Sequence, residues 1–384
     1  MIRRFILNET SYFGPGARTM VPEAIRHLKG NKALVVSDKS LLDFGVTQKV
    51  TKVLDDAGIS YNIFSDIKPN PTITNVRNGI KAFNDAKADI LIAIGGGSSI
   101  DTAKGIGIVI NNPDFSDIVS LEGAANTTSP SIPIIAIPTT AGTAAETTIN
   151  YVIIDEKRQK KMVCCDPNDI PKIAIIDAEL MYSLPKSLTA ATGMDALTHA
   201  IEGYITKGAW EMSDMFEVEA IKMISKYLPI AVAEPTNPVG RDGMAVAQYI
   251  AGMAFSNVGL GLVHGMAHPL GALFDVPHGV ANALLLPIVM EFNLPSSLEK
   301  FAKVAKAMGV ETSQMNTQKA AEAAVKAVKS LAMQIGIPQH LSELGIRESD
   351  IEPLANQAIS DVCTPGNPRD MSKEDIISLY KKAL

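Results

Sequence analysis

Apolar runs and amphipathic segments alternate through the first part of the chain, and their spacing predicts a succession of strands and helices. Apolar residues at helical spacing predict helices at 46–58 and 73–88. Residues 89–110 have the pattern of a strand, a glycine loop and a helix. Apolar runs predict further strands at 32–38, 61–67, 132–140 and 172–180. Strands that recur between helices of this length are typical of an α/β fold with a doubly wound parallel sheet.

The pattern changes after Leu184-Pro185. Residues 150–166 still predict strands around a charged turn, but beyond Pro185 helical patterns are interrupted by proline and glycine, with hardly any strand signal. We therefore expect two domains, an α/β domain at 1–185 and an all-helical domain at 186–384. Residues 1–14 fit an apolar, weakly charged edge strand, which is a candidate for pairing with a second subunit.

Composition and charge exclude several classes of protein. A chain of 384 residues with 46% hydrophobic and 20% charged residues is an ordinary globular protein, and a net charge of −6 without a basic patch argues against a nucleic-acid binder. The N-terminus lacks the long apolar core of a secretory signal, and no apolar run is long enough for a membrane helix. Cys164, Cys165 and Cys363 do not make a disulfide framework, so we expect a cytoplasmic protein.

Glycines at a strand-to-helix junction indicate a nucleotide site. Gly96, Gly97 and Ser98 lie between the predicted strand and helix of 89–110. Glycine lets the backbone approach a pyrophosphate closely, and the N-terminus of the helix offers N–H donors to it. The run is not a complete G-x-G-x-x-G, because Ile100 stands where the third glycine would be. By itself the loop also fits a tight strand-to-helix turn.

Other polar residues near strand ends fit the same ligand. A carboxylate at Asp38 suits an adenosine ribose and repels a 2′-phosphate, which favours NAD over NADP. Asp38 equally fits the N-cap of the next helix, and it precedes the glycine loop, in contrast to a standard Rossmann domain. Thr139, Thr140 and Thr143 form a hydroxyl-rich loop that suits phosphate or ribose, or merely caps a helix. Lys161 belongs to a charged cluster that also fits a solvated turn.

Histidines and a carboxylate recur at metal-ligand spacing in the second half of the chain. Asp195 and His199 are four residues apart and so lie on one face of a helix. His264 and His268 repeat this spacing, and His278 follows beyond a proline. Asp195 and His199 with any two of the other three histidines would form a site. These ligand types suit Fe(II) or Zn(II), with Mn(II) or Co(II) as alternatives, and the placement of the pairs implies a cleft between the domains.

The chain resembles the iron-dependent alcohol dehydrogenase family (group III) essentially from Asn8 to its end. The paired histidine segments carry this resemblance more specifically than the glycine loop does. The matching stretches are GGGSSIDTAK (95–104), PTTAGTAAE (138–146), ATGMDALTHAIEGY (191–204), GLVHGMAHPLGA (261–272) and PHGVANALLLP (277–287). The resemblance implies a dinucleotide-binding α/β domain followed by an all-helical metal domain, similar to dehydroquinate synthase.

The resemblance also implies roles for individual residues. The metal ligands would be Asp195, His199, His264 and His278. His268 would stand beside the metal as a catalytic residue, near the nicotinamide or in a proton path. The cofactor-binding positions would be Asp38, Asn70, Gly96, Gly97, Ser98, Thr139, Thr140, Thr143, Asn150 and Lys161. Asn150 also fits a place facing the substrate, and Cys363 and Phe255 fit the lining of its pocket.

The expected activity is hydride transfer between NAD(H) and a small alcohol or aldehyde, with Fe(II), or alternatively Zn(II), polarising the substrate oxygen. The resemblance implies a homodimer, while the net charge and the lack of a long apolar run lead us to expect neither a nucleic-acid nor a membrane partner. Three rivals stay open. The first is a dehydroquinate synthase-type lyase, which needs basic residues that 189–206 and 255–287 lack. The others are a zinc-dependent relative of the glycerol dehydrogenase type and an inactive cofactor-binding protein.

Overall fold

The computed structural model describes residues 2–384, which form two compact units. The α/β unit comprises the chain up to Thr140 together with Ala144–Tyr182, and the helical unit comprises Ala141–Thr143 and Ser183–Leu384. The loop of three threonines is thus divided: Thr139 and Thr140 belong to the α/β unit, and Thr143 belongs to the helical unit.

The α/β unit contains a six-stranded parallel sheet with the strand order β1-β9-β6-β4-β2-β3. Its strands are β1 (Thr10–Phe13), β2 (Lys32–Ser37), β3 (Ser60–Phe64), β4 (Ile90–Gly95), β6 (Ile134–Pro138) and β9 (Ile173–Ile176). The helices of this unit are α1 (Val21–His27), α2 (Lys39–Asp43), α3 (Val46–Asp56), α4 (Ile73–Ala86) and α5 (Gly97–Asn111).

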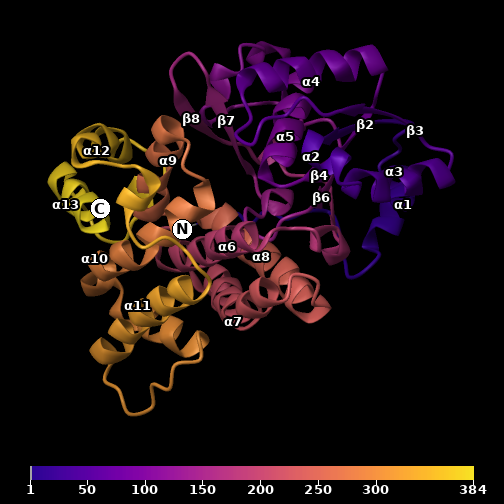
Figure 1. Ribbon diagram of the computed structural model, residues 1–384. Helices are drawn as coiled ribbons and strands as arrows, with labels where there is room; N and C mark the ends of the chain where they lie inside the picture. The colour runs from indigo at the N-terminus through magenta and orange to yellow at the C-terminus, as the bar shows by residue number, and fades with distance from the viewer. Residues whose placement is uncertain (1) are drawn as a thin grey trace. The chain divides into compact units, whose positions relative to one another are not determined.

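Apolar residues cover both faces of this sheet, which is why its strands read as nearly continuous apolar runs. Successive side chains of β2 enter different cores: Leu34 packs with residues of α4 and α5, whereas Val35 packs with residues of α1 and α3. Figure 1 shows these two pairs of helices on opposite sides of the strands. The predicted doubly wound parallel sheet is therefore confirmed.

A second, smaller sheet follows the pattern predicted at 150–166. Strands β7 (Asn150–Asp155) and β8 (Lys160–Cys165) form an antiparallel hairpin around the charged turn, and β5 (Gly123–Ala124) pairs with β8. The edge strand predicted at 1–14 is confirmed only over β1, which pairs with β9. Met1 lies outside the described residues.

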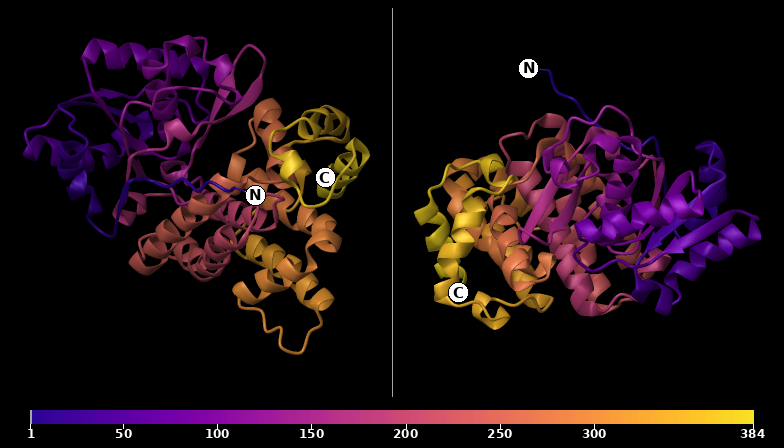
Figure 2. Two further views of the ribbon diagram at one scale, coloured as in Figure 1. Left: turned by 180° about the vertical axis from the view of Figure 1, so that it is seen from behind. Right: turned by 90° about the horizontal axis from the view of Figure 1, so that it is seen from above.

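The helical unit consists of helices over its described residues, without a strand. They are α6 (Lys186–Ile205), α7 (Glu211–Ala233), α8 (Pro238–Val258), α9 (Leu262–Phe274), α10 (His278–Ala307), α11 (Thr317–Gln334), α12 (Ile351–Ile359) and α13 (Lys373–Ala383). Figure 2 shows these helices from two further directions. Among the described helices none alone has the length and hydropathy of a membrane span, whereas α8 and α9 together, bent by 101°, pass that test.

Candidate metal centre

Helix α6 brings three polar side chains to one buried face of the helical unit. Asp195, His199 and Glu202 are spaced by four and three residues, so they lie on successive turns of the same side. Only 2% of Asp195, 5% of His199 and 2% of Glu202 is exposed. Polar side chains this deeply buried require partners, because each loses its hydration.

Two further helices place three histidines beside this face. His264 and His268 lie on successive turns of α9, and His278 is the first residue of α10. The start of α10 packs directly on α6: a Cβ atom at Gly279 would lie 2.4 Å from the carbonyl oxygen of Ala191. Glycine at this position therefore permits the approach of the two helices.

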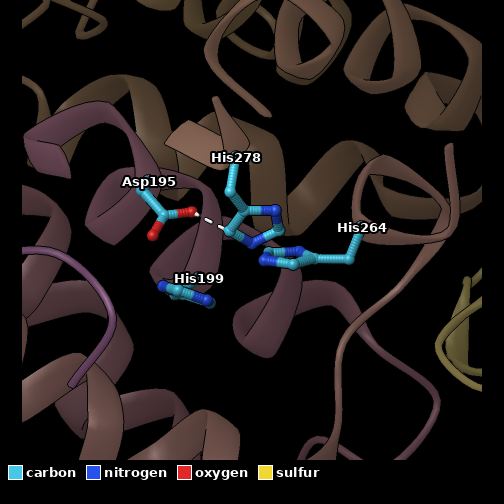
Figure 3. A group of neighbouring side chains, drawn as sticks. All are labelled: Asp195, His199, His264 and His278. Atoms are coloured by element: carbon cyan, nitrogen blue, oxygen red, sulfur yellow. Dashed lines mark ion pairs between the residues drawn. The ribbon is translucent and has the colours of Figure 1, made fainter. Parts of the chain in front are cut away.

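Four of these residues meet at one point. One ligand-type atom from each of Asp195, His199, His264 and His278 lies within 4.8 Å of the others. The His278 Nε2 atom is 3.7 Å from the Asp195 Oδ1 atom, as drawn in Figure 3. His268 is not a member of this group, although its ring stacks on that of His278 with a centroid distance of 5.5 Å.

Burial keeps two imidazoles of this group, those of His199 and His264, uncharged. Desolvation lowers the pKa of His199 to about 4, against the opposing charge of Asp195. Desolvation likewise lowers the pKa of His264 to about 3. Both rings are therefore neutral at pH 7 and each presents a lone pair, which is the form that binds a metal.

The contacts of Asn282 indicate whether the four converging residues suit a cation. The Asn282 Nδ2 atom donates to Asp195 Oδ1 at 2.7 Å and contacts His264 Nε2 at 3.1 Å and His278 Nε2 at 3.2 Å. One amide NH2 group thus lies against three potential metal-ligand atoms, which is more than its two N–H bonds can satisfy. The Asn282 Oδ1 atom is buried and has no hydrogen-bond partner among the described residues. Convergent acceptors of carboxylate and imidazole type fit a divalent transition metal.

His268 has its own carboxylate partner. Its Nδ1 atom lies 2.8 Å from Asp361 Oδ2, and Asp361 Oδ1 accepts a hydrogen bond from the Cys363 backbone N–H at 2.9 Å. Burial opposes ionisation of Asp361, but the charge and hydrogen bond of His268 lower its pKa. His268 is therefore oriented from the side of Asp361 and differs in its contacts from the four converging residues. Phe255, predicted to line the pocket, stacks on His199 with a centroid distance of 4.2 Å.

The α/β unit places several predicted cofactor residues at one edge of its sheet. Asp38, Gly96 and Thr139 follow β2, β4 and β6, which are neighbouring parallel strands. Dinucleotides bind at the carboxyl ends of such strands. Gly95 has a φ of 155°, and a Cβ atom there would lie 2.3 Å from Ser99 Oγ, so the turn into α5 requires glycine. Asp38 accepts the Leu41 backbone N–H at 3.0 Å and therefore does cap α2.

Other predicted cofactor residues lie on segments tied to this turn. Ser98 Oγ donates to the carbonyl oxygen of Pro69, next to Asn70. The hairpin that carries Asn150 and Lys161 joins the same loop, because the Ile154 backbone N–H donates to the Pro71 carbonyl oxygen at 2.8 Å. These contacts bring Asn70, the glycine turn and the β7–β8 hairpin to one region of the α/β unit.

The structure adds three residues that the sequence reasoning missed: Glu202, Asn282 and Asp361. Glu202 lies three residues after His199, and Asn282 lies four residues after His278, so helical spacing from a candidate ligand was an available signal. Asp361 is 93 residues from His268, and local spacing gives no sign of their contact.

Comparisons with known proteins show the family of the chain. The model of the iron-containing alcohol dehydrogenases matches residues 8–178, and the C-terminal model of the Fe-containing alcohol dehydrogenase family matches residues 189–384. The chain is 53% identical to the lactaldehyde reductase of Escherichia coli (strain K12) over 383 residues, which cover 100% of each chain.

Solved structures show the same similarity. The crystal structure of a 1,3-propanediol oxidoreductase superposes with a TM-score of 0.97 at 42% sequence identity, with 100% of each chain covered. A sulfoacetaldehyde reductase from Bifidobacterium kashiwanohense in complex with NAD+ gives a TM-score of 0.88 at 30% identity and covers 100% of this chain and 99% of that one.

The chain belongs to the iron-containing alcohol dehydrogenase family. It is an NAD-dependent oxidoreductase that acts on alcohols or aldehydes, and its cofactors are NAD and iron.

Proposed function

We propose that this enzyme transfers hydride between NAD(H) and a small alcohol or aldehyde, with lactaldehyde and 1,2-propanediol as its substrate pair. The observation that carries the proposal is the convergence within 4.8 Å of Asp195, His199, His264 and His278, of which the first three are buried. The choice of substrate is supported by the 53% identity to the lactaldehyde reductase of Escherichia coli over the full chain. Further support comes from resemblance to that enzyme in FILNETSYFG (5–14), DPNDIP (166–171), ITKGAW (205–210) and DVCTPGNPR (361–369).

The four converging residues are the proposed ligands of the metal. A divalent cation held there supplies Lewis-acid polarisation of the substrate oxygen, and NAD(H) carries the hydride. Asp195 contributes the single carboxylate of the set, and the neutral imidazoles of His199 and His264 contribute lone pairs.

His268 is the proposed catalytic residue for proton movement. Its ring lies beside His278, and its Nδ1 atom is fixed by Asp361 at 2.8 Å. A histidine held by a carboxylate on one nitrogen can take or release a proton at the other, which suits the exchange of the hydroxyl proton with solvent.

Cofactor binding is assigned to the α/β domain at 1–185 and metal binding to the helical domain at 186–384. The ribose contact of Asp38 and the phosphate contacts of the turn at Gly96, Gly97 and Ser98 follow from their place at the carboxyl edge of the sheet. We place the enzyme in the cytoplasm as a homodimer, without a nucleic-acid or membrane partner.

There are two alternatives to this proposal. One is another substrate for the same reaction, and the other is a different reaction. The TM-score of 0.97 to a 1,3-propanediol oxidoreductase favours 1,3-propanediol as the second candidate. A lyase of the dehydroquinate synthase type would need lysine or arginine around an anionic substrate. The stretches 189–206 and 255–287, which carry the proposed ligands, contain neither residue.

Metal reconstitution tests the proposal directly. The purified protein is stripped with a chelator under anaerobic conditions, and NADH consumption with lactaldehyde is followed after addition of Fe(II) or Zn(II). We expect recovery with Fe(II). Recovery with Zn(II) alone would move the enzyme to the zinc-dependent relatives. If lactaldehyde is reduced with neither metal while NADH still binds, the proposed substrate is wrong and 1,3-propanediol is tested next.

The nucleotide preference tests Asp38 separately. Asp38→Gly removes the carboxylate that would repel the 2′-phosphate, so the kcat/KM ratio of NADH to NADPH is expected to fall by at least about tenfold, a difference of about 1.4 kcal/mol. An unchanged ratio with normal thermal stability would leave Asp38 as a helix cap only.

A further inference from the structure

Glu202 joins the metal-binding face of α6 to the first turn of α9. Its Oε1 atom accepts the Val263 backbone N–H at 2.6 Å, and its Oε2 atom accepts the His264 backbone N–H at 3.3 Å. The same Oε2 atom lies 2.6 Å from the Nδ1 atom of the His264 ring. One carboxylate therefore contacts both the backbone and the side chain of a proposed ligand.

The backbone contacts replace a missing helix cap. The N-cap position of α9 is Gly261, which has no side chain to accept the first N–H groups of the helix. Glu202 supplies these acceptors from a neighbouring helix, and acceptor oxygens suit the positive end of the helix dipole. The position of the first turn of α9, and with it the Cα atom of His264, is thereby tied to α6.

The ring contact fixes which nitrogen of His264 carries the proton. Asn282 Nδ2, which can only donate, lies 3.1 Å from His264 Nε2, so Nε2 acts as an acceptor. In a neutral imidazole the proton is then on Nδ1, from which it is donated to Glu202 Oε2. This tautomer directs the Nε2 lone pair toward Asp195 and His278, where the proposed metal would bind.

We infer that Glu202 is a positioning residue that holds His264 in the ring orientation and tautomer needed to bind the divalent cation, and that it thereby sets the affinity for that cation. The inference rests on the proposed ligand set, of which His264 is a member. Carboxylates that orient a metal-bound histidine in this way change metal affinity by about 10–100-fold when they are lost.

Glu202→Gln separates this role from simple burial. If the amide oxygen takes the place of Oε1 and faces the Val263 N–H, the amide NH2 takes the place of Oε2 and faces His264 Nδ1. This arrangement favours the tautomer with a proton on Nε2, which cannot bind a metal through Nε2. If the amide turns over, its NH2 group opposes the N–H of Val263 and the cap is lost. Either arrangement weakens cation binding while the volume of the side chain is kept.

The experiment measures Co(II) and Zn(II) affinity by chelator competition in the full-length protein, with Co(II) absorption reporting the ligand geometry. Glu202→Gln is expected to bind about 10–100-fold more weakly with an altered Co(II) spectrum. Glu217→Gln is the matched control, because Glu217 is also fully buried in the helical unit but has no recorded contact with a proposed ligand. Its cation affinity should equal that of the unsubstituted protein.

The outcomes distinguish the inference from the proposal beneath it. Unchanged Co(II) binding in Glu202→Gln, with binding lost in His264→Ala, would overturn the role of Glu202 and keep the ligand set. Full binding in His264→Ala would overturn the ligand set itself. If Glu202→Gln does not fold, nitrogen NMR of labelled histidine in the unsubstituted Zn(II) protein decides: a proton on His264 Nδ1 supports the inference, and metal binding through Nδ1 contradicts it.

Discussion

Each unit contains a cluster of buried polar side chains, and the two clusters compensate for the lost hydration of these groups in different ways. In the α/β unit the cluster surrounds Lys104, which is fully buried. Its Nζ atom donates to the Thr148 carbonyl at 2.7 Å, to Thr148 Oγ1 at 3.0 Å and to the Asn150 carbonyl at 2.8 Å. In the helical unit the cluster consists of the proposed metal ligands, where the Asn282 amide is the donor that meets the convergent acceptors.

The acidic side chains near Lys104 show how strongly burial shifts the pKa of a carboxyl group. Desolvation raises the pKa of Asp101 to about 6, although Lys104 and the Val152 backbone N–H lower it. Desolvation also raises the pKa of Asp169 well above its usual range, against the charge of Lys104. Even a neighbouring ammonium group only partly offsets the loss of hydration.

The difference between the clusters is the source of the cation. The α/β unit carries its positive charge covalently on Lys104, so the cluster is complete once the chain folds. The helical unit collects a carboxylate and three imidazoles without a lysine or arginine among the converging residues. In the proposed site a divalent cation from solution would complete the cluster and, unlike a lysine side chain, would leave a coordination position for the substrate. A cation carried by a side chain suits a structural role, whereas a cation bound from solution suits catalysis.

The largest expected change in stability comes from a substitution in the Lys104 cluster. Lys104→Met removes three hydrogen bonds and leaves buried carbonyls and acids without their positive partner, so we expect a loss of about 3–5 kcal/mol in unfolding free energy. Urea unfolding of the metal-loaded protein measures it. The exposed Lys52→Met variant should change stability by less than about 0.5 kcal/mol. Equal stabilities for the two variants would mean that Lys104 is not the cation its cluster depends on.

Chelation should produce the next largest effect, in the other cluster. A cation that binds only the folded protein stabilises it by about 2.7 kcal/mol at 100 times its Kd. For a unit of this size the melting temperature should rise by about 5–10 °C on adding the metal to stripped protein. Scanning calorimetry with and without Zn(II) measures the shift. His264→Ala is the control, and a shift of the same size in that variant would place the cation elsewhere.

The two units also show which features of the fold and of the site could be predicted from the sequence. The strand order along the chain and the sheet type were predictable, because parallel strands buried on both faces are continuous apolar runs. The histidine pairs were visible because helical spacing is local. The contact of Asp361 with His268 and that of Glu202 with the start of α9 join separate elements, so packing alone determines them. The two readings of Asp38 could not be separated from spacing, since an N-cap and a ribose contact place the same carboxylate at the same strand end.

Glu217 is a third case. It is a buried carboxyl group in the helical unit that belongs neither to the Lys104 cluster nor to the proposed metal ligands. It is fully buried, and neither carboxyl oxygen has a hydrogen-bond partner among the described residues. Desolvation, with the charge of Asp214, raises its pKa well above the usual 4.5, and Lys300 opposes this only in part. Burial should therefore keep the proton on this group in a pH range where the same group has already released it in the unfolded chain.

This protonation gives the smallest effect, which is visible only as a pH dependence. Above pH 4.5 the unfolded chain releases the proton of Glu217 and the folded chain retains it, so the unfolded state binds fewer protons. The unfolding free energy therefore falls as pH rises through this window, by at most about 1.4 kcal/mol per pH unit. Glu217→Gln removes this slope. Urea unfolding at pH 5.5 and 6.5 should show the variant gaining on the unsubstituted protein at the higher pH, by at most about 1.4 kcal/mol. Parallel pH profiles would mean that Glu217 is ionised when folded, and that a buried carboxylate in this unit can do without a nearby cation.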